Sequence, residues 1–344
     1  MSDAFEEVVG QPAAVSMLRA AVTNPLPSYL FIGPAGCGAR TLATSFAAEL
    51  LSHGREDSRR HRRLAISEEH PDLIVFERAG PSISVEQARE IVRAATTSPF
   101  NGDRKVILIE DIHLAFGAAP MLLKVLEEPP QSTYFLLTAE EIPEQLATIA
   151  SRCCQVDLVA MTPHDLLGVL DGSGLDEQRS SAIATVANGS IDRALLLASD
   201  NDALERWTTW QQVRLTLDGS GNAVTQTADQ LLAMVDDAAA PLQERQDRER
   251  DELDERAERF GERGLGRRSL EDRHKREVRK LRTDELAMGI TAISISIRED
   301  LETGRIDAGS ALASLEAVTK AAENLRRNPN ERLLLQRLFL NLNS

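Results

Sequence analysis

Hydrophobic residues in the first 160 positions form short continuous runs, separated by stretches whose apolar residues have helical spacing. Four runs are typical of buried strands, at residues 29–32, 72–77, 105–110 and 134–139. The stretches between them place apolar side chains on one helical face, at residues 41–51, 85–95 and 120–128. Apolar strands that alternate with helices are typical of a parallel sheet covered on both faces. The pattern therefore predicts an α/β fold for this part of the chain.

Beyond residue 157 the strand signal ends and helical spacing takes over. Thr162 and Pro163 form an N-cap and first-turn pair for a short helix that ends near residue 170. Further helices are expected at residues 176–187 and 191–198, and from about residue 201 onward, with a loop at 219–221. These changes predict three domains: an α/β domain over residues 1–160, a small helical domain over 161–200, and an all-helical domain over 201–344.

A dense mixture of Arg, Glu and Asp fills residues 243–283. From Glu244 to Lys280 there are 13 Arg and Lys against 12 Asp and Glu, so this is not a basic arm for nucleic acid. Sparse apolar positions recur at helical spacing, and glycines interrupt them between residues 261 and 266. We predict a solvated helical hairpin with ion pairs between residues four apart, and partial disorder around residues 260–269.

Composition narrows the classes of protein. The chain has 344 residues, 42% of them hydrophobic and 4% aromatic, which favours several helix-rich cores over a β-sandwich. A net charge of −15 argues against a dedicated nucleic-acid binder. The three cysteines, Cys37, Cys153 and Cys154, give no disulfide framework. The first residues lack a signal peptide and no apolar run is long enough to span a membrane, so we expect a cytoplasmic protein.

The segment GPAGCGAR, residues 33–40, begins like a phosphate-binding loop and then departs from the pattern. Its outer glycines have the spacing of G-x-x-x-x-G-K-[ST], but Ala39 stands at the Lys position and Arg40 at the hydroxyl position. A tight strand-to-helix connection is one interpretation. A frame longer by one residue, in which Arg40 and Thr41 replace Lys and Thr, is another. The candidate residues are Gly33, Gly36, Gly38, Ala39, Arg40 and Thr41.

Two acids follow the third predicted strand. Glu110 and Asp111 end the run KVILIED, which is similar to a Walker B strand, where one acid helps hold Mg²⁺ and the next orients water. The usual order is Asp then Glu, and this chain has the reverse. Acids at this end of a strand are commonly solvated caps, but the position is also the ligand edge of an α/β sheet.

Taken together, these segments resemble the clamp-loader AAA+ proteins of bacterial DNA polymerase III. The resemblance covers most of the N-terminal half and is weak between about residues 200 and 310. It rests on the order of these segments: VVGQPAAVSML (8–18), GPAGCGAR (33–40), HPDL (70–73), ISVEQAREI (83–91), KVILIEDIHL (105–114), LLKVLEEPP (122–130), FLLTAEEIPEQLATIASRC (135–153), ANGSIDRALLL (187–197) and NPNERLLLQRLFL (328–340).

The resemblance implies an AAA+ ATPase-like module, a small helical lid and a helical collar that joins five subunits in a ring. In such rings ATP lies at subunit interfaces, and the Arg of a Ser-Arg-Cys motif enters the neighbour's site as an arginine finger. That motif is here Ser151, Arg152 and Cys153. Taken alone, Arg152 would be expected to contact helix-end carbonyls. The implied partners are the motor (gamma/tau) and delta subunits, and indirectly the sliding clamp and primed DNA.

Departures from the active pattern imply a subunit that does not hydrolyse ATP. Besides the altered loop and the exchanged acids, the sensor Arg expected two residues after Ser190 is Asp192, with Arg193 one place later. The four-Cys zinc module often found before HPDL is also missing, because residues 51–69 hold no cysteine. The histidines at 53, 61 and 70 have no cysteine partners. We therefore expect no metal and no bound cofactor, with ATP held by neighbouring subunits.

Two other interpretations remain open at this point. The chain could be an active ATP-binding motor subunit of the same loader, which requires the longer loop frame and tolerance of Asp192. It could instead be an interaction scaffold outside replication, with the hairpin at residues 243–283 as its working surface.

Overall fold

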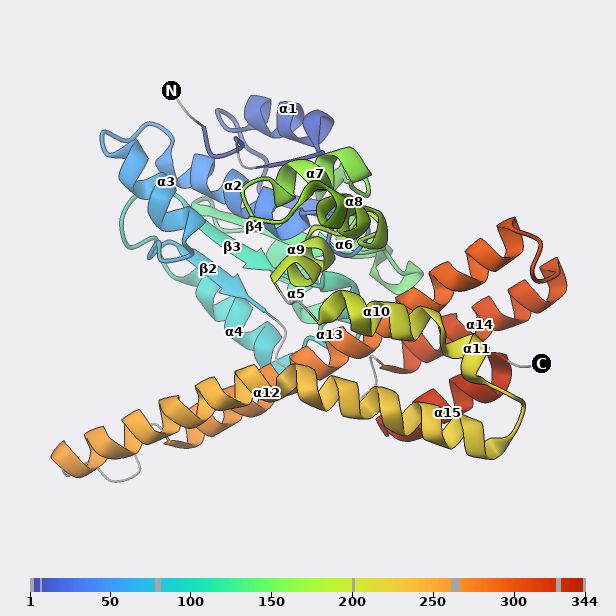
Figure 1. The fold of residues 1–344 in the computed structure, drawn as a ribbon. Helices are drawn as coiled ribbons and strands as arrows, with labels where there is room; N and C mark the ends of the chain where they lie inside the picture. Colours follow the sequence, from blue (N-terminus) through green and yellow to red (C-terminus); the bar gives the residue numbers. More distant parts are fainter. Residues whose placement is uncertain are drawn as a thin grey trace. The chain divides into compact units, whose positions relative to one another are not determined.

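The computed structural model describes residues 3–6, 8–77, 82–199, 202–260, 267–325 and 329–342. The chain divides into two compact units, Met1–Asp200 and Asn201–Ser344. The first unit combines a sheet with helices, and the described part of the second is helical (Figure 1). The boundary that the sequence predicts at residue 160 lies inside the first unit and stays a prediction.

A five-stranded parallel sheet forms the centre of the first unit. The strands lie in the order β2-β3-β4-β1-β5, so the chain crosses over between neighbours as the predicted α/β fold requires, and that fold is confirmed. Their bounds are β1 Ser28–Ile32, β2 Leu73–Phe76, β3 Lys105–Ile109, β4 Thr133–Ala139 and β5 Cys154–Asp157.

Helices cover both faces of this sheet (Figure 1). Alternate residues of β1 point to opposite cores: Phe31 packs with Phe46 of α2, while Leu30 packs with the side chains of α4 and α5. The helices of the unit are α1 Pro12–Ala21, α2 Ala39–Ser52, α3 Ser58–Ile66, α4 Val85–Thr96, α5 Ala119–Glu127, α6 Ala147–Ala150, α7 Pro163–Leu170, α8 Glu177–Val186 and α9 Ile191–Ser199, with short 3₁₀ turns η1 Ile112–Leu114 and η2 Glu144–Leu146.

The predicted N-cap of α7 is confirmed. The hydroxyl of Thr162 accepts a hydrogen bond from the backbone N–H of Asp165, whose carboxylate accepts one from the N–H of Thr162. Pro163 occupies the first turn, where its missing N–H costs nothing.

The described residues of the second unit form six helices: α10 Ala203–Gln211, α11 Val213–Thr216, α12 Gly221–Phe260, α13 Arg267–Glu302, α14 Ala308–Leu325 and α15 Glu331–Leu342. Its core includes the buried rings of Trp207 and Trp210, and a buried ion pair joins Arg206 of α10 to Glu285 of α13, with nitrogen–oxygen distances of 3.0 and 3.2 Å. Replacing one partner of such a pair with an uncharged residue leaves the other charge buried and unpaired, which destabilises the fold.

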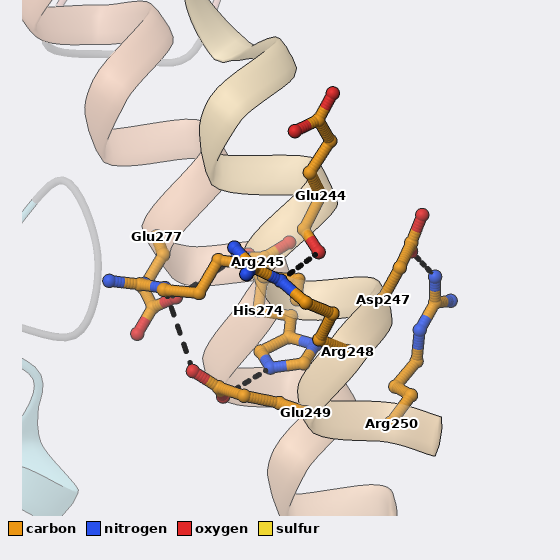
Figure 2. A network of polar contacts seen from close by, with 9 residues as sticks. Glu244, Arg245, Asp247, Arg248, Glu249, Arg250, His274 and Glu277 are labelled. Carbon is orange, nitrogen blue, oxygen red and sulfur yellow. Dashed lines mark hydrogen bonds and ion pairs between the residues drawn. The ribbon is translucent and has the colours of Figure 1, made fainter. Parts of the chain in front are cut away.

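The charged hairpin is formed by α12 and α13, which run side by side beyond the core of the unit (Figure 1). Polar side chains meet between them at residues 245–249 and 274–277. Gln246 is buried and donates to the carbonyl of His274 at 3.2 Å and to Glu277 at 2.9 Å, while the His274 ring contacts Glu249 (Figure 2). The interruption predicted between residues 261 and 266 lies outside the described residues, as does most of the segment expected to be partly disordered.

Three elements were not predicted from the sequence. β5 pairs with β1 at the edge of the sheet, so the strand signal extends to residue 157. The helices α1 and α3 lie at residues for which the apolar pattern predicts neither a helix nor a strand. Pro241, inside α12, does not end that helix.

Candidate functional site

The phosphate-loop-like segment connects β1 to α2 at the carboxyl edge of the sheet. Gly36 and Gly38 have φ values of 75° and 83°, a backbone conformation that residues with a Cβ rarely adopt. The helix α2 begins at Ala39, directly after Gly38. The turn of a nucleotide loop is thus present, with α2 placed as a phosphate-binding helix would be.

Other parts of the same unit engage the backbone of this loop. The N–H of Ile191, the first residue of α9, donates to the carbonyl of Gly36 at 2.8 Å. The side chain of Gln11 donates to the carbonyls of Cys37 at 3.1 Å and Val159 at 2.8 Å. A Cβ at Gly36 would lie 2.0 Å from the hydroxyl oxygen of Ser190, so the start of α9 lies directly against the loop.

The guanidinium of Arg40 lies among three carboxylates. It contacts Glu68 at 2.8 Å, Glu77 at 2.6 Å and Glu110 at 2.6 Å. Burial by itself would lower the pKa of Arg40, but the hydrogen bonds that it donates to Glu68 and Glu77 and the charge of Glu110 raise that pKa above its ordinary value. Arg40 therefore keeps its charge and joins the loop to the acid that follows β3.

Each acid reaches Arg40 from a different segment. Glu68 follows α3 and has a φ of 58°, a strained backbone for a residue with a side chain, and it accepts from both Nε and Nη2 of Arg40. Glu77 follows β2, and Glu110 follows the neighbouring strand β3. The fold thus collects three negative charges where the first turn of α2 supplies one positive charge.

The second Walker B-like acid begins a turn. Asp111 has a φ of 53° and precedes η1, and its N–H donates to the Thr138 hydroxyl of β4 at 3.3 Å. Both acids are half-buried, and the carboxylate of Glu110 forms an ion pair with Arg40 of the loop.

The remaining loop residues carry little reactive chemistry. Cys37 is buried in the core beneath the sheet face that α2 covers, and burial raises the pKa of its thiol, with a smaller contribution from the charge of Asp192. Ala39 has no polar group, and Thr41 is exposed. Arg193, next to Asp192, donates to the carbonyl of Ala187 at 2.9 Å, and burial lowers its pKa.

Arg152 lies at the end of α6, with its side chain 34% exposed. Its Nη1 donates to the carbonyl of Thr148 at 2.8 Å, as expected for an Arg at a helix end, and its Nη2 contacts the carboxylate of Glu127. Ser151 is exposed, whereas Cys153 packs in the core on the α4–α5 side, where burial raises the pKa of its thiol to about 12. The guanidinium of Arg152 is thus the exposed charged group of the motif, whereas the Cys153 thiol is half-buried.

No metal site forms within the described ranges, where His, Cys, Asp and Glu nowhere gather in a group of three that could hold an ion. His61 and His70 instead hydrogen-bond to each other, with 2.8 Å between Nδ1 and Nε2, and His53 is exposed. Every helix in those ranges is too short or too polar to cross a lipid bilayer.

Sequence reasoning missed Glu68 and Glu77 as partners of Arg40, and Gln11 and Ser190 as contacts of the loop. No local signal marks Glu68 or Glu77, because each meets Arg40 only through the tertiary fold. Gln11 lies in a segment used for the resemblance, but its type and position alone do not indicate which carbonyls it contacts.

Comparison with known proteins identifies the N-terminal segment. Residues 10–162 match the family model described as DNA polymerase III, delta subunit. The chain is 38% identical over 136 residues to DNA polymerase III subunit delta' of Pseudomonas aeruginosa, covering 37% of this chain and 42% of that protein. Residues 10–162 are thus similar to subunits of DNA polymerase III.

The tau subunit of Bacillus subtilis DNA polymerase III is also similar, at 31% identity over 56% of this chain and 37% of that protein. These alignments span about two fifths of the length of each relative. A gamma subunit-related protein of Thermotoga maritima has the same overall fold, with a TM-score of 0.50 and 14% identity over 96% of this chain and 97% of that one. This last likeness supports the fold alone.

Proposed function

We propose that this chain is a delta-prime-type subunit of a DNA polymerase III clamp loader that neither binds nor hydrolyses ATP. In this proposal it works in the cytoplasm, in a five-membered ring with gamma/tau motor subunits and a delta subunit. It supports ATP-dependent loading of a sliding clamp on primed DNA. Residues 201–344 would form its collar, residues 161–200 its lid, and Arg152 would complete the ATP site of a neighbouring motor subunit.

The observation that carries the proposal is the position of Arg40. In a working P-loop, a Ser or Thr at this position holds Mg²⁺, and an acid after the neighbouring strand completes the metal site. Here a fixed guanidinium stands next to Glu110, so a positive charge from the chain itself meets the acid that would otherwise face the metal. The missing Lys at Ala39 removes the group that would reach the outer phosphates.

The exposure of Arg152 supports the second half of the proposal. Its Nη1 contacts Thr148, its Nη2 contacts Glu127, and part of the planar group faces solvent, so a γ-phosphate presented by a neighbour could be met without unfolding α6. An arginine at such a site stabilises the charge that develops during phosphoryl transfer, and contributes about 10³–10⁵ in rate in known cases.

A motor subunit is the second candidate. It is favoured by the tau relatives, whose similarity extends over 56% of this chain or more, against 37% for the delta' relative of Pseudomonas. It requires Arg40 and Thr41 to replace Lys and Thr. Arg40 would first have to leave its three carboxylates.

The test of the finger is ATP turnover by a ring reconstituted from this chain and its motor and delta subunits. We expect Arg152→Ala to lower DNA-stimulated turnover at least tenfold at the affected site while the ring still assembles. Arg152→Lys should also be impaired, because a lysine lacks the planar fork. Arg89→Ala, which removes an exposed arginine from α4, is the matched control and should leave turnover unchanged. Unchanged turnover by Arg152→Ala would refute the finger.

A further inference from the structure

Helix α3 is basic within an acidic chain. Residues 53–63 contain five arginines against two acids, whereas the whole chain carries a net charge of −15. Two of these arginines serve the fold: Arg55 donates to the carbonyl of Asn101, and Arg62 contacts Glu49 at 2.7 Å. The other three, Arg59, Arg60 and Arg63, are exposed.

These three guanidinium groups have no ion-pair partner among the described residues. Glu56 and Asp57 precede the helix and are exposed, yet neither forms an ion pair with the three arginines there. An open hollow of about 400 Å³ lies over the start of the helix, lined by Glu56, Asp57, Ser58, Arg59, Arg60 and Arg63. The surface is thus a concave basic patch rather than a set of internal ion pairs.

The spacing of the arginines suits a regular row of anions. Arg59 and Arg63 are four residues apart and Arg60 and Arg63 are three apart, so their side chains lie about one helical turn from each other on one side of α3. A nucleic-acid strand presents phosphates at a regular interval along a stiff backbone, and Arg binds phosphate with two parallel hydrogen bonds. An acidic peptide offers carboxylates on flexible side chains, whose ordering costs entropy.

The residues of α3 beside the patch also favour nucleic acid over a protein partner. Ile66 is the large apolar residue that α3 exposes, and the helix has no aromatic residue apart from the buried His61. Protein interfaces are usually anchored by buried aromatic or large apolar groups, whereas phosphate contacts need none.

We propose that the face of α3 formed by Arg59, Arg60 and Arg63 binds the phosphate backbone of nucleic acid, without reading its sequence. Binding by the isolated chain is weak, in the range of about 10⁻⁴–10⁻⁶ M that is typical of non-specific contacts. Glu56 and Asp57 line the same hollow and offset part of its positive charge, which leaves an excess of one arginine there. Negative charge more than about 8 Å away is largely screened at physiological salt. The proposal does not depend on Arg152 or on any nucleotide site.

The experiment measures the fluorescence anisotropy of a short labelled DNA duplex and a labelled single strand with the full chain, at salt concentrations of about 50 to 200 mM. We expect Arg59→Gln/Arg63→Gln to reduce the slope of log affinity against log salt by about 2, roughly one for each lost phosphate contact. Arg89→Gln/Arg93→Gln removes two exposed arginines with the same spacing from α4 and is the matched control, which should leave the slope unchanged.

Three results would overturn the proposal. The unaltered chain could fail to bind either DNA at the lowest salt, or the α3 variant could keep the full salt slope. An acidic peptide could bind to α3 more tightly than DNA does, with the same dependence on Arg59 and Arg63, and the patch would then be assigned to a protein partner. Thermal unfolding of both variants, compared with the unaltered chain, checks that each remains folded.

Discussion

A guanidinium group at position 40 lies between the first turn of α2 and the acid after β3, where a nucleotide loop would place a hydroxyl and a metal ion. It forms ion pairs with three carboxylates that come from different segments, those of Glu68, Glu77 and Glu110. A loop that exchanges a metal-binding hydroxyl for a fixed cation keeps its backbone turn and changes its chemistry. At the scale of single residues, this exchange separates the chain from a working P-loop.

A second residue-scale feature is the buried pair His61 and His70. The N–H of Asp72 can only donate, so the Nδ1 of His70 at 3.0 Å accepts, and the Nε2–H of His70 then donates to the Nδ1 of His61. Both rings are neutral in this arrangement. Burial lowers the pKa of both histidines below their ordinary value of 6.5, with further lowering of His61 by Arg55 and Arg60 and of His70 by His61, while Asp57 and Asp72 act in the opposite direction.

This pair makes stability sensitive to acid. Because both pKa values are lower in the folded chain, the unfolded chain takes up protons first as the pH falls below about 6.5. The free energy of unfolding should therefore fall between pH 7 and pH 5, by up to about 1.4 kcal/mol per pH unit for each histidine involved. Urea unfolding at several pH values measures this slope.

The variant His70→Asn isolates the effect. An asparagine oxygen can still accept from the N–H of Asp72 but does not titrate, so we expect a shallower acid slope, together with about 1 kcal/mol lower stability at pH 7.5 from the lost bond to His61. His53→Asn, at an exposed position before α3, is the control and should keep the slope. An unchanged slope in His70→Asn would mean that other groups cause the acid sensitivity.

At the scale of elements, most of the sheet and its helices could be predicted from apolar patterns, and the exceptions have physical reasons. The four strands with continuous apolar runs were predicted, but β5 is a short edge strand in which Val156 is the buried residue. Helix α3 buries His61 and Ala65 and has no apolar stripe to mark it. For the site, the sequence analysis named the loop, Glu110, Asp111 and Arg152 as candidates. It did not name Glu68 or Glu77, which meet Arg40 only through the tertiary fold.

Close packing at Gly289 gives a prediction at this scale. Gly289 lies in α13, and a Cβ there would lie 2.2 Å from the Cδ2 and Cε2 atoms of the buried Trp210 ring of α10. Gly289→Ala gains helix propensity of about 1 kcal/mol, but forcing α10 and α13 apart costs about 1–3 kcal/mol. We expect a net loss of about 1 kcal/mol in the free energy of unfolding, measured by urea titration.

Gly168 in α7 provides the matched comparison, because a Cβ there meets nothing within 4 Å. Gly168→Ala should therefore stabilise the chain by up to about 1 kcal/mol through helix propensity alone. A stabilising Gly289→Ala would show that the two helices separate more easily than their packing indicates.

At the scale of the whole molecule, the first unit has an α/β fold in which several segments meet at the loop after β1. Helix α9 lies against the loop through Ile191 and Ser190, and three carboxylates hold Arg40 in place. Under the proposed function, these features and the carboxylate of Asp192 would all act against a bound triphosphate. The architecture would then serve to present Arg152 and the ring-forming surfaces rather than to turn over ATP.

The deciding measurement is equilibrium binding of a fluorescent ATP analogue to the purified chain, with Mg²⁺, up to millimolar concentrations. We expect no saturable binding, because Ala39 offers no charge to the phosphates, the acid at Glu110 faces Arg40, and the carboxylate of Asp192 repels them. A motor subunit measured in parallel shows that the analogue is active.

Mg²⁺-dependent binding would instead favour the motor-subunit interpretation. The variant Arg40→Ala then shows whether Arg40 takes part in that binding or obstructs it. If Arg40 replaces the missing lysine, this variant loses binding. If Arg40 only obstructs the site, removing it exposes Glu68, Glu77 and Glu110 and binding is retained or strengthened by Mg²⁺ at these carboxylates. Since Arg152 is in another segment, a chain that binds no nucleotide could still act on a neighbour as proposed, and the two measurements together test both halves of the proposed function.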